Sequence, residues 1–167
     1  GYIAIETPVR SVFCMTSLQL SNFIKLNALD RIVGTTSTRF LFNEEMKERI
    51  KAKEVSQIGI EGNFDTEIIL SLNPDIILVS PFKRGGYESI TDLNIPLVSF
   101  LGYKELTPLG QAEWLKFTAM LLGLEEEANQ LFNQIEYKYN ELKALAAAVE
   151  KRPTVMSGEM RSGSWYV

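Results

Sequence analysis

The chain has 167 residues, of which 46% are hydrophobic and 10% aromatic, so it can bury the core of one domain and does not have a disordered composition. Its net charge of −4 provides no basic surface for nucleic acid, and no nucleic-acid partner is expected. Histidine is absent, which excludes Ser-His-Asp and Cys-His catalysis and every His-ligated metal site. The single cysteine, Cys14, lies in an apolar run, where a buried and inert thiol is expected. We expect no metal, no cofactor and no membrane-spanning segment.

The first third of the chain predicts a β-α-β unit. Residues 10–15 form an apolar run typical of an inner strand, Thr16 and Ser17 open a helix that Asp30 ends, and residues 32–34 give a second strand. A right-handed crossover places Thr16 and Ser17 at the carboxyl end of a strand, where α/β sheets bind ligands. Simple helix capping by these hydroxyls is the alternative.

The segment that follows is polar and then aromatic. Arg39 and Phe40 could face a cleft, because they follow the carboxyl end of the second strand. Asn43 is expected to cap a charged helix over residues 44–53, whose acid–base spacing indicates a solvated face.

Residues 63–80 combine a short helix, a stop and a buried strand. Asp65 is a plausible helix N-cap, and Pro74 forces the helix to end near Leu72 because the residue before proline disfavours the α conformation. The unbroken apolar run 76–79 predicts a strand covered on both faces, as in a parallel sheet.

The loop after this strand is the strongest ligand-contact candidate in the chain. Residues 80–87 hold two cations, two aromatic residues and two glycines at the carboxyl end of an inner strand, although an ordinary surface loop would have a similar composition. A short helix over 88–93 and a fourth strand over 95–100 follow, and the proline in that strand suggests an edge position or a strand start. Tyr103 then lies at the same end of the sheet.

From residue 107 onward the pattern becomes helical. Thr107 caps a helix with Pro108 at its first position, and this helix runs to Leu122. A second helix begins with the acids 125–127, and its apolar residues recur every three or four positions over about six turns, which gives a length of ~37 Å. One small lobe does not need so long a helix.

The last seventeen residues predict a strand over 153–157, a turn-like loop over 159–164 and the start of another strand at Trp165. A two-stranded hairpin alone is marginally stable. It could therefore begin a missing second lobe, pack back onto the first lobe, or pair with another copy of the chain.

The stretch 65–75 resembles the segment N-hydrophobic-E-x-I-x-x-L-x-P-D of the substrate-binding proteins of bacterial ABC importers for siderophores, haem and cobalamin, the class III binding proteins with a bridging helix. Leu72, Pro74 and Asp75 match, Glu67 falls on the family's glutamate, and Asp65 replaces its asparagine. LDRIVG at 29–34 and NIPL at 94–97 are also similar to family wording.

The resemblance implies an α/β fold with a small parallel sheet of about four strands flanked by helices, then a long bridging helix and the first strands of a missing second lobe. The corresponding ranges are 1–106 for the N-terminal lobe, 107–150 for the bridging helical segment and 151–167 for the start of a truncated C-terminal lobe.

The resemblance also implies a function: an extracytoplasmic component of an ABC importer, not an enzyme, that binds an iron-siderophore, haem or cobalamin-like ligand between two lobes and delivers it to the permease. The full-length protein would be periplasmic or extracytoplasmic and lipid-anchored. The lack of histidine argues against the zinc and manganese branch and against haem held by histidine. Glu67 would dock on a permease arginine, whereas the residues alone suggest only a first-turn acid that complements the helix dipole.

The expected ligand contacts come from loops at strand carboxyl ends and from the start of the second lobe. Cationic side chains suit carboxylates and catecholate-iron complexes, and aromatic ones suit planar or apolar ligand parts. The expected contacts are Thr16, Arg39, Phe82, Lys83, Arg84, Tyr103, Arg161 and Trp165.

Other classes remain open at this point. A free-standing doubly wound nucleotide-binding or signalling module would need a phosphate-cradling glycine loop or an acidic pocket, and the sequence has neither GxGxxG nor GxxxxGK[ST]. An enzyme would need paired carboxylates or a nucleophile elbow, and neither stands out. The hairpin and the long helix could also drive a swapped dimer.

Overall fold

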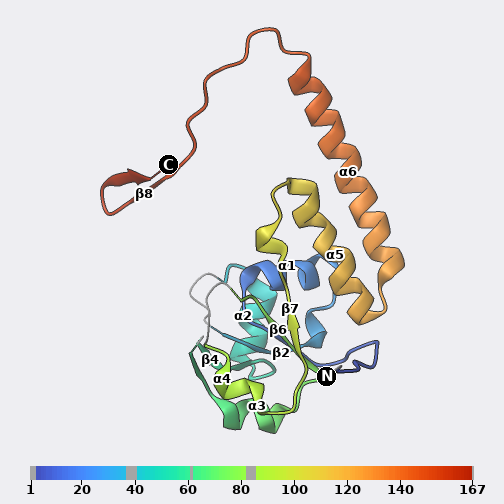
Figure 1. The fold of residues 1–167 in the computed structure, drawn as a ribbon, viewed down its shortest axis with the longest axis vertical. Helices are drawn as coiled ribbons and strands as arrows, with labels where there is room; N and C mark the ends of the chain where they lie inside the picture. The colour runs from blue at the N-terminus through green and yellow to red at the C-terminus, as the bar shows by residue number, and fades with distance from the viewer. Residues whose placement is uncertain (1–2, 37–40, 61, 82–85, 167) are drawn as a thin grey trace.

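The computed structural model describes residues 3–36, 41–60, 62–81 and 86–166. A parallel sheet with strand order β3-β2-β1-β6-β7 lies between two layers of helices (Figure 1). The strands are β1 (Val12–Cys14), β2 (Ile32–Thr35), β3 (Ser56–Gln57), β6 (Ile76–Val79) and β7 (Leu97–Ser99). All neighbouring strands are parallel, so the chain has the predicted α/β class.

The sheet has five strands, where the sequence predicted about four. The additional strand is β3, in which Ser56 pairs with Gly34 and Gln57 with Thr35. Two polar residues at a sheet edge carry no hydrophobic pattern, and only their pairing with β2 makes them a strand. The fourth predicted strand, β7, is at the other edge, as its proline suggested.

Six helices are present in the described part of the chain, with two 3-10 turns and two small hairpins outside the main sheet. The helices are α1 (Ser17–Lys25), α2 (Glu44–Lys51), α3 (Thr66–Leu72), α4 (Glu88–Thr91), α5 (Pro108–Leu122) and α6 (Glu125–Ala147); the 3-10 turns are η1 (Leu29–Arg31) and η2 (Gly102–Lys104); the hairpins pair β4 (Gly59–Ile60) with β5 (Asn63–Phe64) and β8 (Glu159–Arg161) with β9 (Ser164–Tyr166).

Helix starts agree with the sequence patterns better than helix ends. The predicted caps Asn43, Asp65 and Thr107 each accept a hydrogen bond from the backbone N–H three residues on. In contrast, α1 ends at Lys25 rather than near residue 29, because Asn27 adopts a left-handed conformation with φ 52° and a separate 3-10 turn follows.

The sheet is buried on both faces. In β6, Ile76 and Leu78 belong to one core cluster, while Ile77 and Val79 belong to a second cluster. The first cluster also contains apolar residues of α1, α2 and α5, and the second contains residues of α3 and α4. The run of four apolar residues thus alternates between two cores, as expected for an inner parallel strand.

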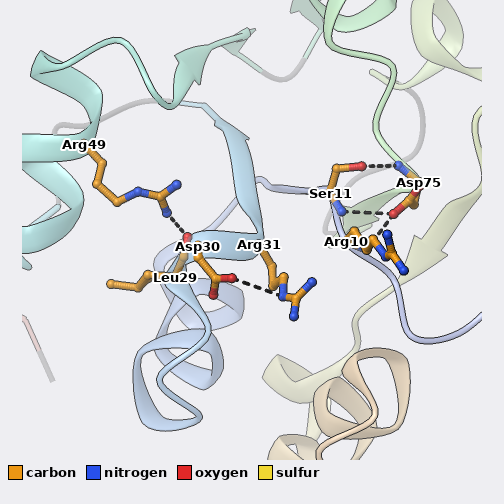
Figure 2. Close-up of polar contacts among 7 residues, drawn as sticks. All are labelled: Arg10, Ser11, Leu29, Asp30, Arg31, Arg49 and Asp75. Carbon is orange, nitrogen blue, oxygen red and sulfur yellow. Dashed lines mark hydrogen bonds and ion pairs between the residues drawn. The ribbon is translucent and has the colours of Figure 1, made fainter.

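Two polar clusters join separate segments of the chain away from the strand interiors (Figure 2). The Asp75 carboxylate accepts the backbone N–H groups of Arg10 at 2.6 Å and Ser11 at 3.0 Å, and so ties the start of β6 to the segment that leads into β1. In the second cluster, the Arg49 guanidinium of α2 donates to the carbonyl of Leu29 in η1.

The C-terminal part of the chain extends away from the sheet. Helix α6 continues past the layer that covers the sheet, and the remaining chain runs apart from it (Figure 1). The prediction of a strand over 153–157 was wrong, since these residues are described and none is in a strand. The hairpin instead uses β8 and β9 around Ser162 and Gly163, both with positive φ (47° and 81°), which fits a tight two-residue turn.

Candidate ligand-binding site

Four loops meet at one edge of the sheet. Because β1, β2, β6 and β7 are parallel, the residues that follow them (Met15, Thr36, Ser80 and Phe100) emerge on the same side. The hydroxyl of Thr36 donates to the carbonyl of Met15 at 2.6 Å, which joins the loops after β1 and β2. This carboxyl edge is where open α/β sheets bind ligands.

A cavity of about 230 Å³ opens at this edge beside the start of α1. Its walls combine hydroxyl groups with apolar side chains, a mixture that can orient a ligand through a few polar contacts. The lining residues are Met15, Thr16, Ser17, Leu20, Thr35, Thr36 and Leu41.

Thr16 both caps a helix and lines this cavity. Its hydroxyl accepts the backbone N–H of Gln19 at 3.3 Å, and the Gln19 side chain in turn accepts the N–H of Thr16 at 3.2 Å, which completes a capping box. Ser17, the next residue, is exposed. The two interpretations of Thr16 and Ser17, capping and ligand contact, are therefore compatible in this structure.

Buried polar groups connect the loops behind the cavity. The Gln19 carboxamide oxygen accepts the N–H of Met15 at 2.7 Å, and its NH₂ group donates to the Ser80 hydroxyl at 2.9 Å. Ser80 donates in turn to the Phe100 carbonyl at 3.3 Å. Among the described residues, no buried side-chain nitrogen or oxygen lacks a hydrogen-bond partner.

Two tyrosines hold the backbone where the loop after β6 begins. The Tyr87 hydroxyl donates to the carbonyl of Ser80 at 2.9 Å, and the Tyr103 hydroxyl donates to the carbonyl of Pro81 at 2.8 Å. Tyr103 lies in η2, directly after β7, so its predicted position at the carboxyl edge is confirmed. Its hydroxyl donates to the protein's own backbone, and its half-buried ring lies 5.9 Å from the Lys104 ammonium, so its role as a ligand contact stays a prediction.

Arg39, Phe82, Lys83 and Arg84 lie outside the described residues, as does the side chain of Arg161. Trp165 lies on β9 opposite Met160 and is 48% exposed.

Glu67 occupies the first turn of α3, where its side chain is exposed. This position is consistent with both interpretations made from the sequence, a docking residue and an acid that complements the helix dipole.

The sequence reasoning missed Gln19, Ser80 and Thr36. A signal existed for Gln19, because Thr16-Ser17-Leu18-Gln19 has the spacing of a capping box. Ser80 is the first polar residue after the fully buried β6. This position indicates where the strand ends, but it does not indicate which group Ser80 bonds to. The contact of Thr36 with Met15 depends on strand pairing and leaves no mark in the sequence.

Metal-ligating and thiol groups form a separate class of candidate in the described part of the chain. This part contains no group of three or more histidine, cysteine, aspartate or glutamate side chains placed to hold a metal ion. Burial raises the pKa of the Cys14 thiol well above its usual value, which opposes thiolate formation. Within the same residues, no helix has the length and apolar character needed to cross a membrane.

Comparison with known proteins identifies the family and relatives of this chain. The sequence pattern of the family described as "Periplasmic binding protein" matches residues 12–167. An uncharacterized lipoprotein of Methanocaldococcus jannaschii is 26% identical over 145 residues, which cover 81% of this chain and 35% of that protein. An uncharacterized protein of the same organism is 27% identical over 164 residues and is covered to 49%.

Solved structures share the fold at low sequence identity. The molybdate-binding protein MolA of Haemophilus influenzae matches with a TM-score of 0.72 and 18% identity, over 88% of this chain and 51% of that one. The siderophore-binding protein BauB, bound to two acinetobactin molecules and ferric iron, matches with a TM-score of 0.69 and 17% identity, over 89% and 52%. A periplasmic haem-binding protein of Pseudomonas aeruginosa matches with a TM-score of 0.63 and 14% identity, over 84% of this chain and 48% of that one.

The chain thus spans about half the length of these structures and half or less of the curated relatives. The match over residues 12–167, together with the five-stranded sheet and the α5–α6 helix pair, shows that this chain belongs to the periplasmic binding protein family, whose members are non-enzymatic solute-binding proteins.

Proposed function

We propose that this chain is part of the extracytoplasmic solute-binding component of an ABC importer, which holds an iron-siderophore, haem or cobalamin-like ligand between two lobes and delivers it to a permease. The observation that carries the proposal is a cavity with hydroxyl and apolar walls, lined by the ends of β1 and β2 and the start of α1, at the edge where four parallel strands end. A solved relative bound to acinetobactin with ferric iron and another described as haem-binding support the siderophore and haem parts of this ligand range.

Ligand binding can be tested directly on the purified protein. Native mass spectrometry with ferric siderophores, haemin, cobalamin and molybdate would reveal a ligand adduct and its class; molybdate is included because MolA is a solved relative. A one-to-one adduct with an iron-siderophore, haemin or cobalamin is expected. Binding of none of the four, or of molybdate alone, would contradict the proposal.

A pair of variants on one helix tests whether the cavity is the site. Ser17→Trp places a bulky ring at the cavity wall and should abolish the adduct or weaken it at least tenfold. Ser21→Trp is the control, because Ser21 is also exposed on α1 but does not line the cavity. Equal affinity for both variants would move the site away from this cavity.

We infer that the second lobe begins after α6, with residues 1–106 as the first lobe, 107–150 as the bridging helical segment and 151–167 as the entry into the other lobe. The extension of α6 past the sheet supports this division, as does the coverage of about half of the BauB structure and of one curated relative. Expression of the complete gene followed by limited proteolysis should yield two stable fragments. A product that resists cleavage anywhere near residue 150 would argue against it.

Glu67 is the proposed contact with the permease. Glu67→Lys should reduce uptake in cells or in a reconstituted importer while leaving ligand affinity unchanged. Glu45→Lys provides the control, since Glu45 is likewise an exposed acid in the first turn of a short helix, α2. If both variants transport equally well, Glu67 is only a helix-dipole residue.

A lipid anchor outside the cytoplasm is the proposed location of the full-length protein. The support comes from two archaeal relatives that are described as lipoproteins. Detergent, but not high salt, should release the full-length protein from the membrane fraction. Recovery in the salt wash would exclude a lipid anchor.

A further inference from the structure

Gln19 is a fully buried amide at the carboxyl edge of the sheet, and each end of its side chain serves a different loop. The carboxamide oxygen accepts two backbone N–H groups of the loop after β1, from Met15 at 2.7 Å and Thr16 at 3.2 Å. The NH₂ group donates at 2.9 Å to the hydroxyl of Ser80, the residue that follows β6. A single side chain therefore joins two loops, through a hydrogen bond between residues 61 positions apart in the sequence.

Ser80 extends this connection to a third loop. Its side chain is almost completely buried, and its hydroxyl accepts from Gln19 while donating at 3.3 Å to the carbonyl of Phe100, the residue that follows β7. The hydroxyl has one proton, so the direction of the chain is fixed: the Gln19 amide donates, Ser80 accepts, and Ser80 donates onward.

We propose that Gln19 and Ser80 are positioning residues, which form a polar bridge that holds the loops after β1, β6 and β7 in one arrangement for ligand binding. This inference rests on the proposed function of the carboxyl edge. The bridge touches no ligand itself. It fixes the backbone of Met15 and Thr16, which line the cavity, relative to the Ser80–Pro81 backbone that Tyr87 and Tyr103 hold.

A simple role in filling the core does not account for these contacts. A buried amide and a buried hydroxyl are costly unless every polar group is satisfied, and apolar side chains would fill the same space without that requirement. Strand pairing ends where the strands end. Beyond that point, the hydrogen bonds of these polar groups position the loops relative to one another.

The chain offers a matched buried polar contact elsewhere. Thr118 of α5 is fully buried, accepts from the Asn22 amide at 3.0 Å and donates to the Trp114 carbonyl at 3.3 Å. This contact lies between α1 and α5 rather than among the strand-end loops. Its loss should reduce stability without affecting the arrangement of the loops.

The test measures amide hydrogen exchange, residue by residue, in the ligand-free protein. Ser80→Ala should raise the exchange rates of the Met15 and Thr16 amides about tenfold beyond the change in global stability, although Ser80 does not contact them, because Gln19 loses its fixed partner. Gln19→Met removes their acceptor and should raise the same rates at least as much. Thr118→Val should change these rates only in line with global stability.

Two results would overturn the bridge: wild-type exchange at Met15 and Thr16 in Ser80→Ala, or an equal rise in Thr118→Val. If Ser80→Ala does not fold, Ser80→Cys takes its place, since a thiol is only a weak hydrogen-bonding group. The ligand found for the wild-type protein should bind Ser80→Ala about tenfold more weakly and Thr118→Val within twofold. Equal affinity of Ser80→Ala and wild type would refute the link to binding.

The two measurements also separate this inference from the proposed function. If the wild-type protein binds none of the probe ligands while Ser80→Ala still loosens the Met15 and Thr16 amides, the bridge between the loops is supported and the ligand proposal fails. If the wild-type protein binds a ligand but Ser80→Ala leaves the exchange rates of the Met15 and Thr16 amides unchanged, the bridge is refuted and the ligand proposal stands.

Discussion

The sheet and the second half of α6 both carry apolar residues at regular spacing, but these residues are buried in the sheet and exposed in the helix. Phe13 and Ile77 in the sheet are completely buried. Leu142 and Leu145 in α6 are 66% and 68% exposed, and from residue 133 to the end of the helix only Tyr139 is even half-buried. The spacing of apolar residues selects a face of an element, but only a second packed surface removes that face from water.

The beginning of α6 has such a second packed surface, which α5 provides. Ala128 and Phe132 are buried against α5, and the Lys116 ammonium lies 3.9 Å from the centre of the Phe132 ring. The last part of α6 extends beyond the end of α5 (Figure 1). The contrast between the two regions can be tested by substitutions of decreasing effect.

The largest effect is expected in the sheet. Phe13→Ala should lower the free energy of unfolding by about 3–5 kcal/mol, because it removes a buried ring and leaves a cavity. Urea unfolding followed by circular dichroism measures the change. A loss below about 1 kcal/mol would mean that the sheet core is looser than this packing indicates.

Asp75 ties two strand starts together, and its removal should have a smaller effect. The backbone N–H of Arg10, with further hydrogen bonds from Ser11, lowers the pKa of the Asp75 carboxyl, although partial desolvation opposes this shift. The folded state thus favours the charged form, so the stabilisation is complete above the ordinary aspartate pKa of about 3.9 and is lost as the pH falls through the lower folded-state pKa.

Asp75→Asn should therefore cost about 1 kcal/mol at pH 7, since the carboxylate is exposed to solvent, and the cost should diminish in acid. Urea midpoints compared at pH 7 and pH 3 measure this. Asp65→Asn serves as a control that keeps a capping side chain, and it should change little. An Asp75→Asn effect that is the same at both pH values would contradict the assignment.

Thr16→Ala removes the capping box of α1 and should cost about 1 kcal/mol. Thr16→Ser keeps the hydroxyl and should restore most of that stability. Thermal unfolding of the three proteins provides the comparison. If the alanine variant is as stable as the serine variant, the cap contributes no stability.

The smallest effect is expected in the exposed half of α6. Leu142→Ala should change the free energy of unfolding by less than about 0.5 kcal/mol, because the side chain is already in water. A loss of 2 kcal/mol or more would show that something covers this face in solution. A swapped dimer of the chain, proposed from the sequence, would give that result together with a doubled mass in light scattering.

Local chemistry determined much of this molecule before any packing was considered. Asp65, Pro74 and the apolar run after it fixed the place of α3 and β6, because capping and the restriction before proline act between neighbouring residues. Thr107, Pro108 and Gly123 bounded α5 for the same reason.

The sequence also placed Thr16 and Tyr103 correctly at strand ends, since in a parallel sheet the residue after each strand emerges on one known edge. The capping role of Thr16 was one of two predicted interpretations, whereas the hydrogen bond from Tyr103 to the Pro81 carbonyl could not be predicted. Ser80 and Thr36 meet partners from other strands, and the resulting contacts depend on strand order and register, which individual segments do not encode.

Only the tertiary structure decided the outcome at the margins of the fold. β3 exists because β2 offers an open edge, α1 ends early because Asn27 turns the chain into η1, and the last hairpin forms around Ser162 and Gly163 rather than from residue 153. The exposed stripe of α6 is the plainest case. Its residues alone set the spacing, whereas burial is a property of two surfaces in contact, and the described chain supplies only one of them.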